Sequence, residues 1–261
     1  MRRAISVAFC VLILCSLLLI GIANAGNAAY SITEIYGAAT ATIDGKWTSP
    51  SEWTDAPHVF MTGNATGKFS YKVDSGLATM WIVEMLADNT NNTGDYVQIC
   101  FDDTNSGGSA PSSGDFMLEI DGHSTLKIFS GSGTGWTQIA NTAEITWANT
   151  IGTSMWSSTP HWILEIMDSS KTDGTVTIAT QPPTGMRIAA FDAATNGFCA
   201  WAPGSTANNP SSWGVVADFA TEIPEGFSFG AVVLIASIAM FVGFYYLRKK
   251  PNIPHINSAR L

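Results

Sequence analysis

The stretch LATMWIVEMLADNTNNTGDYVQICFD, residues 77–102, contains two strand-like runs separated by a polar loop. Leu77–Leu86 is apolar on both faces, which is typical of a central strand covered on both sides. In Asp95–Asp102 every second residue is strongly apolar, so that one face carries Val97, Ile99 and Phe101. The stretch therefore predicts two β-strands, and the Asn, Thr and Gly residues between them predict a loop.

The same alternation of short runs and turn residues continues to residue 192. The runs are Phe116–Ile120, Thr125–Phe129, His161–Met167, Thr175–Thr180 and Gly185–Asp192. The first two flank residues 121–124 and predict a hairpin with a four-residue loop, whereas the third sends Trp162, Leu164 and Ile166 to one face. Regular short strands without a long helical pattern predict an all-β domain at residues 26–222, an antiparallel β-sandwich of jelly-roll or immunoglobulin-like type.

Two apolar segments frame this domain. Residues 1–25 combine a basic start, an apolar run and Ala23-Asn24-Ala25, the pattern of a cleaved signal peptide. Phe227–Leu247 would span about 31 Å as a helix, the thickness of a bilayer core, and Arg248-Lys249-Lys250 follows it. The alternatives are a retained N-terminal anchor and a buried core helix. We expect a single-pass cell-surface protein with its N-terminus outside, a linker at 223–226, a transmembrane helix at 227–247 and a cytoplasmic tail at 248–261.

The charge is unevenly distributed along the chain. Six of the 12 Lys and Arg residues lie in the two framing segments, whereas all 21 Asp and Glu residues lie between them. The outer part therefore has six basic and 21 acidic residues, a net charge of −15. Such a surface repels phosphate backbones, so the sequence argues against nucleic-acid binding.

Two of the four cysteines remain after removal of the signal peptide, Cys100 and Cys199. No C-x-x-C pair suggests a zinc or haem-attachment site. The two thiols could form a disulfide that closes a long loop, or each could be a small buried apolar residue. The sequence leaves both possibilities open because it gives no distance between them.

Three stretches carry a resemblance to a known family. Ile43-Asp44-Gly45-Lys46-Trp47, followed by Glu52-Trp53-Thr54-Asp55-Ala56, resembles the opening of family 9 carbohydrate-binding-module-like and DOMON-like domains. Asp95–Asp102 is similar to their middle strand, which an Asp ends, and His161–Ile166 is similar to their late Trp-x-x-Glu strand. The resemblance covers about residues 43–219. It implies a jelly-roll or immunoglobulin-like sandwich that binds sugar or, in some branches, haem.

All nine tryptophans lie between the two framing segments. We expect those in apolar runs and in the opening motif to pack, namely Trp81, Trp162, Trp47 and Trp53. Three others stand beside Gly, Ser, Asn or Pro in predicted loops: Trp136, Trp156 and Trp201. Because a flat indole can stack on the apolar face of a sugar ring, these three are the candidate carbohydrate-binding residues. Partial packing under a loop is the alternative for each.

Two acidic groups are candidate cation sites. Asp102 and Asp103 end a strand at a Gly-rich loop that Asp115 closes, and Asp88, Asn92 and Asp95 form a second group. Oxygen ligands in loops suit Ca²⁺, so Ca²⁺ at Asp102, Asp103 and Asp115 is the expected cofactor, although Asp and Asn are also what turns require. Asn64 and Asn91 begin N-glycosylation sequons in predicted loops.

Signatures of catalysis are missing from the sequence, which has no G-x-S-x-G, H-E-x-x-H or phosphate-binding loop. The sequence does not exclude a carboxylate pair for glycoside hydrolysis, since its spacing is invisible here. DOMON-type cytochromes bind haem through a Met and a His, which makes Met117 or Met155 with His123 or His161 the candidate pair, but haem is not expected.

The C-terminal segment has a second interpretation. Ile223-Pro224-Glu225-Gly226, an apolar helix and a basic cluster resemble the PEF/PGF-type sorting signals of prokaryotic surface proteins, which are cut and replaced by an anchor. The sequence predicts a membrane-anchored, non-catalytic surface protein that binds carbohydrate or surface glycan. The alternatives are a structural or adhesive surface-layer component without a small ligand and a haem-binding electron-transfer domain.

Overall fold

The computed structural model describes residues 26–169, 176 and 183–217. The expected signal peptide, most of the Thr175–Thr180 run, and the segments at 223–226, 227–247 and 248–261 lie outside these residues. Among the residues described, the structure contains no helix with the length and apolar character needed to cross a bilayer.

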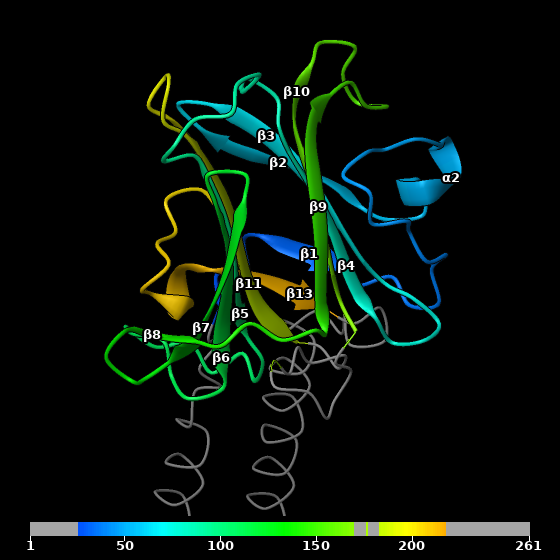
Figure 1. The fold of residues 1–261 in the computed structure, drawn as a ribbon. Coiled ribbons are helices and arrows are strands. Elements are labelled where there is room, and N and C mark those ends of the chain that lie inside the picture. The colour runs from blue at the N-terminus through cyan, green and yellow to red at the C-terminus, as the bar shows by residue number, and fades with distance from the viewer. Residues whose placement is uncertain (1–25, 170–175, 177–182, 218–261) are drawn as a thin grey trace, which may run out of the picture. The chain divides into compact units, whose positions relative to one another are not determined.

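The described residues form one sheet of 13 strands, with a single short helix and one 3-10 turn (Figure 1). The first strands are β1 (Ser31–Thr33), β2 (His58–Gly63), β3 (Thr66–Val73), β4 (Thr79–Met85), β5 (Tyr96–Asp102), β6 (Asp115–Asp121) and β7 (Thr125–Gly131). The others are β8 (Trp136–Ile139), β9 (Ile145–Gly152), β10 (His161–Asp168), β11 (Thr184–Asp192), β12 (Gly197–Trp201) and β13 (Gly214–Ala217). The helix is α2 (Pro50–Trp53) and the 3-10 turn is η1 (Pro210–Ser212).

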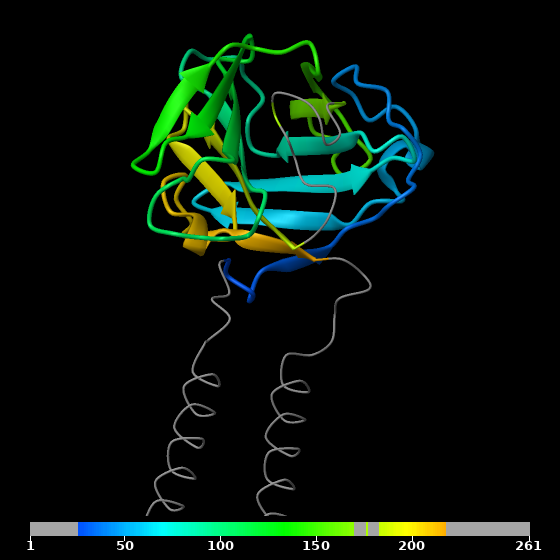
Figure 2. The same cartoon turned by 90° about the horizontal axis from the view of Figure 1, so that it is seen from below.

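The sheet is continuous and curled. Its order is β8-β7-β6-β5-β11-β12-β2-β3-β4-β10-β9, with antiparallel pairing along the whole path, while β13 pairs with β11 and β1. Figures 1 and 2 show the two halves of the sheet facing each other across a shared interior. The predicted all-β antiparallel class is confirmed, and the structure adds that one curled sheet supplies both layers.

The interior contains the apolar faces that the sequence predicts. Val97, Ile99 and Phe101 of β5 belong to the main core cluster, as do Trp162, Leu164 and Ile166 of β10. Strand β4 is buried along its whole length, as expected for a central strand. The predicted hairpin is formed by β6 and β7, but Asp121 pairs with Thr125, so three residues rather than four make the loop.

The opening motif covers part of the outer face of β3, β4 and β10. Trp47 and Trp53 are buried there against Met80, Ile82 and Ile163. The motif is held by a carboxylate on β10: Glu165 Oε1 accepts a hydrogen bond from Trp53 Nε1 at 2.8 Å, and Oε2 accepts from the backbone N–H groups of Asp44 and Gly45 at 3.0 and 2.9 Å. The opening motif and the Glu of the Trp-x-x-Glu strand, about 120 residues apart, therefore form one unit.

The turn in this motif requires glycine. Gly45 has φ +78°, and a Cβ placed on it would lie 2.7 Å from the backbone of Asn149. A side chain at this position would be strained and would also clash with β9. The turn therefore brings two successive N–H groups to Glu165, because its backbone can pass close to the sheet.

Candidate functional site

Beside the opening motif, the outer face carries a cluster of exposed and half-buried side chains, which we call the outer aromatic patch. It consists of His58 and Phe60 on β2, Lys68 on β3 and Trp156 in the β9–β10 loop, where the exposed Met155 precedes Trp156 in the sequence. Phe60 is 58% exposed and Met155 54%, which is unusual for large apolar side chains. The Lys68 ammonium lies 4.6 Å from the ring centroid of Phe60 and 5.4 Å from that of Trp156, so one cation touches both aromatic rings.

Trp156 is held edge-on by two neighbouring rings. Its ring centroid lies 4.9 Å from that of Trp47 and 5.0 Å from that of His58, both in T-shaped geometry. Trp47 is buried, so the opening motif fixes one side of the Trp156 ring. Burial lowers the pKa of His58, and the positive charge of Lys68 lowers it further, so this imidazole is neutral near pH 7.

The loop that carries Trp156 is anchored by a buried ion pair. His161 Nε2 lies 2.9 Å from Glu84 Oε2, which also accepts a hydrogen bond from Ser154 Oγ, while the backbone N–H of Trp156 donates to Ser154 Oγ. His161 Nδ1 donates to the Thr159 carbonyl. Burial lowers the pKa of His161, but the bonds to Glu84 and Thr159 raise it more and the net direction is upward. His161 thus joins both ends of the loop through Thr159 and the Glu84–Ser154 contact, which holds Trp156 in position.

The three tryptophans expected to bind sugar lie in different environments. Trp156 lies in the outer aromatic patch. Trp136 begins β8, where it stacks parallel to Trp213 at 6.3 Å and donates through Nε1 to the Ala207 carbonyl. Trp201 was wrongly placed in a loop: it ends β12, is 3% exposed and packs on Phe69 in the main core. Trp201 is buried and therefore cannot stack on a ligand. Phe60, which was not among the predicted residues, has the most exposed of the large apolar side chains that the structure describes.

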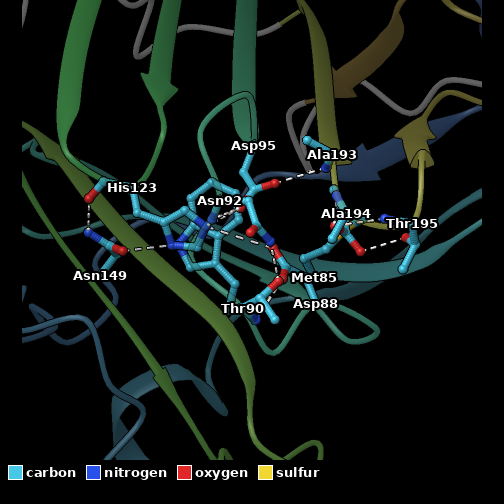
Figure 3. A network of polar contacts seen from close by, with 12 residues as sticks. Met85, Asp88, Thr90, Asn92, Asp95, His123, Asn149, Ala193, Ala194 and Thr195 are labelled. Atoms are coloured by element: carbon cyan, nitrogen blue, oxygen red, sulfur yellow. Dashed lines mark hydrogen bonds and ion pairs between the residues drawn. The ribbon is translucent and has the colours of Figure 1, made fainter.

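A second cluster joins side chains of two loops (Figure 3). Asp88 and Asp95 lie in the β4–β5 loop, and His123 lies in the β6–β7 loop. His123 Nε2 is 3.0 Å from Asp95 Oδ2 and 3.8 Å from Asp88 Oδ2. All three side chains are buried, and their ligand atoms lie within 4.8 Å of one another, so the cluster can hold a metal ion.

The cluster is built into the fold. His123 stacks on Trp162 with ring centroids 3.7 Å apart, and its backbone carbonyl accepts a hydrogen bond from Asn149. Asp95 Oδ1 accepts from the backbone N–H of Ala193 in the β11–β12 turn. Burial raises the pKa of Asp88 against the lowering effect of the Thr90 hydrogen bonds, and Asp95 and Asp192 raise it further. Two of these residues were noted in the sequence, but His123 was not connected with them.

The expected calcium residues make local turn bonds instead. Asp102 accepts from the backbone N–H groups of Ser106 and Gly107, and Asp115 accepts from that of Ser112. Burial raises the pKa of Asp115 to about 6; the hydrogen bond from Ser112 lowers it, and the charges of Asp102 and Asp103 raise it further. Over the described residues, the structure does not gather Asp102, Asp103 and Asp115 into a three-ligand group, and calcium binding there stays a prediction.

The disulfide between Cys100 and Cys199 is not formed, because the two thiols face opposite sides of the sheet. Ala190 on β11 pairs with both Val97 and Cys199, which places Cys199 on the inner face with Val97. Cys100 is three residues from Val97 and so points outward, where it packs with Met117 and Trp213. Burial raises the pKa of Cys100 to about 11 and that of Cys199 to about 12, so both are inert thiols.

The candidate haem ligands and the two glycosylation sequons also lie among the described residues. Both nitrogens of His161 are engaged, and His123 Nε2 faces the aspartates, so neither imidazole is arranged for haem with Met117 or Met155. Asn64 and Asn91 are exposed, in keeping with sequons in loops. The Asn64 amide donates to the Asn196 carbonyl, a bond that a glycan on this nitrogen would have to replace. Glycosylation at both sites stays a prediction.

Comparison with known proteins identifies the fold. No protein-family model matches the chain, and no curated protein sequence matches it. Among solved structures, the chain is similar to a family 9 carbohydrate-binding module from Caldicellulosiruptor kristjanssonii in complex with glucose, with a TM-score of 0.51, 14% identity, and coverage of 72% of this chain and 95% of that one. The same organism's family 9 module in complex with cellotriose gives a TM-score of 0.49 and 15% identity, covering 71% and 93%. The similarity to the glucose complex shows that the described domain has the fold of that module.

Proposed function

We propose that this domain is a non-catalytic carbohydrate-binding module that binds saccharides on the outer aromatic patch. The observation that carries the proposal is the 58% exposure of Phe60 next to Trp156 and Lys68. An exposed ring offers a flat apolar face to a pyranose, and the ammonium and the neutral His58 supply polar groups for its hydroxyls. The fold supports this role, since the similar family 9 module was solved with glucose.

The buried carboxylates support a binding role without catalysis. Glu165 accepts three N–H groups of the opening motif, and Glu84 pairs with His161 and Ser154. Both side chains are fully buried and serve as structural acceptors. A glycosidase needs two carboxyl groups that flank an accessible sugar bond, a condition that these two do not meet.

The proposal also covers the location of the protein at the cell surface. Residues 1–25 act as a signal peptide, and residues 227–247 anchor the domain to the membrane. The patch then faces the outside of the cell, and residues 248–261 lie in the cytoplasm. In a second version, the segment from residue 223 is a sorting signal that is exchanged for another anchor. In both versions the domain reaches surface glycans from a tethered position. Ca²⁺ at Asp102, Asp103 and Asp115 would support the loops of this module.

A matched pair of tryptophan variants tests the proposal. Trp156→Ala should weaken saccharide binding about 10- to 100-fold, since the lost stacking is worth a few kcal/mol at most. Trp136→Ala removes a half-buried ring from the other half of the sheet and should leave affinity within about twofold. Affinity is measured by calorimetry with a saccharide chosen from a glycan array, with thermal melting as a check on folding. An equal loss of affinity in the two variants, or none in either, would contradict binding at this patch.

A further inference from the structure

The cluster of Asp88, Asp95 and His123 is independent of the outer aromatic patch. Its residues come from the β4–β5 loop and the β6–β7 loop, and it contacts the β11–β12 turn through Ala193 (Figure 3). All three side chains are buried, with Asp88 1% and Asp95 0% exposed. Two carboxylates at such depth need compensation for their charge, because burial of unpaired charge is costly.

One carboxylate oxygen in the cluster lacks a hydrogen bond. Asp88 Oδ1 accepts from both the backbone N–H and the hydroxyl of Thr90, whereas the buried Oδ2 has no hydrogen-bond partner. His123 Nε2 lies 3.8 Å from this oxygen, beyond hydrogen-bonding reach. The Oδ2 atom therefore points into the centre of the cluster with capacity for one more partner.

The distances suit a metal ion without rearrangement of the loops. Two ligands bound at about 2.0–2.1 Å in tetrahedral geometry lie about 3.3 Å apart. The distances from His123 Nε2 to the two aspartate oxygens, 3.0 and 3.8 Å, bracket this value. Small side-chain rotations would place all three atoms around one ion.

The donor set selects among metals. Ca²⁺ and Mg²⁺ take oxygen ligands, whereas an imidazole nitrogen is a preferred ligand of Zn²⁺ and other divalent transition ions. We propose that Asp88, Asp95 and His123 bind one divalent transition-metal ion, with Zn²⁺ as the best match. The ion cross-links the β4–β5 and β6–β7 loops. Trp162, which stacks on His123, extends the link to β10.

Metal addition to the metal-free chain tests this site. The untagged full-length chain is treated with chelator, dialysed and melted with ZnCl₂, with CaCl₂ or with neither. Zn²⁺ at a hundredfold excess over its Kd should raise the melting temperature by about 5–10 °C, because it binds only the folded state. Elemental analysis after dialysis should find one Zn²⁺ per chain. No Zn²⁺ shift, or no retained Zn²⁺, would overturn the assignment, and the CaCl₂ sample shows separately whether Ca²⁺ binds elsewhere in the chain.

Two asparagine variants locate the ion. Asp88→Asn keeps the shape and the Thr90 bonds but removes a ligand charge, so it should abolish the Zn²⁺ shift while the metal-free melting temperature stays the same or rises. Asp121→Asn, on the β6–β7 hairpin that carries His123, leaves the three ligands intact and should keep the shift. A Zn²⁺ shift that survives in Asp88→Asn contradicts the site.

Cobalt provides a readout that does not depend on the variants folding. The wild-type chain loaded with Co²⁺ should show the visible ligand-field bands of a four-coordinate site with mixed nitrogen and oxygen ligands. Added Zn²⁺ should remove these bands by competition. A Co²⁺ spectrum unchanged from that of the aquo ion would overturn the proposal even if Asp88→Asn cannot be purified.

Discussion

Replacement of Trp162 by alanine should lower the free energy of unfolding by about 3–5 kcal/mol, within the range for large aromatic deletions from a core. Trp162 is 1% exposed in the main core, stacks on His123 at 3.7 Å and donates through Nε1 to Asn149 Oδ1. The variant would lose apolar burial, leave a large cavity and remove the support of His123. Chemical denaturation followed by circular dichroism measures the loss.

Trp162→Phe serves as the control for this experiment. Phenylalanine fills most of the volume and can stack on His123, but it cannot donate to Asn149. The loss should therefore be clearly smaller than for alanine. If the alanine variant lost less than about 1 kcal/mol, Trp162 would not be a core residue.

The second large effect concerns Glu165 and pH. Burial raises the pKa of Glu165 from 4.5 to about 7, in opposition to the hydrogen bonds from Trp53, Asp44 and Gly45, while Glu52 raises it slightly. An acid whose folded-state pKa is raised stabilises the fold fully below the unfolded pKa of about 4.5 and loses this contribution as pH rises through 7. The shift corresponds to about 3 kcal/mol between the two limits.

We therefore expect the domain to lose stability between about pH 5 and pH 8. Raised pKa values at Asp115 and His161 act in the same direction, since each favours the protonated form in the folded state. In Glu165→Gln no group titrates at this position. The slope of the unfolding free energy against pH should therefore be smaller, by up to the contribution of one proton. The measurement is the unfolding free energy at half-unit pH intervals for both chains. Parallel curves would contradict the role assigned to Glu165.

Much of the fold was predictable because alternation in a strand determines which face meets the core. This held for Val97, Ile99 and Phe101 and for Trp162, Leu164 and Ile166. It failed for Trp201, whose neighbours Pro203 and Gly204 suggested a loop although the short strand β12 ends at this residue. The pairing of Trp201 with Ile188 on β11 buries it, and no local pattern reports that pairing.

The candidate sites were less predictable because they depend on contacts between distant segments. Asp88 and Asp95 were recognised as a group, but His123 joins them from the β6–β7 hairpin. The two cysteines could be assigned to opposite faces only once the register of β5, β11 and β12 was known. For Phe60 a signal was available: in β2 it alternates with Val59 and Met61, which pack on the core, and so it must face outward.

Binding of a saccharide on the outer aromatic patch is tested most directly by the indole N–H resonances of the nine tryptophans. Each resonance is assigned with a Trp→Phe variant, and the native chain is titrated with an oligosaccharide selected from a glycan array. The Trp156 resonance should shift in a saturable way, while those of Trp136 and Trp213 remain in place. Shifts confined to other tryptophans, or no shift with any saccharide, would contradict binding at this patch and favour a structural or adhesive role.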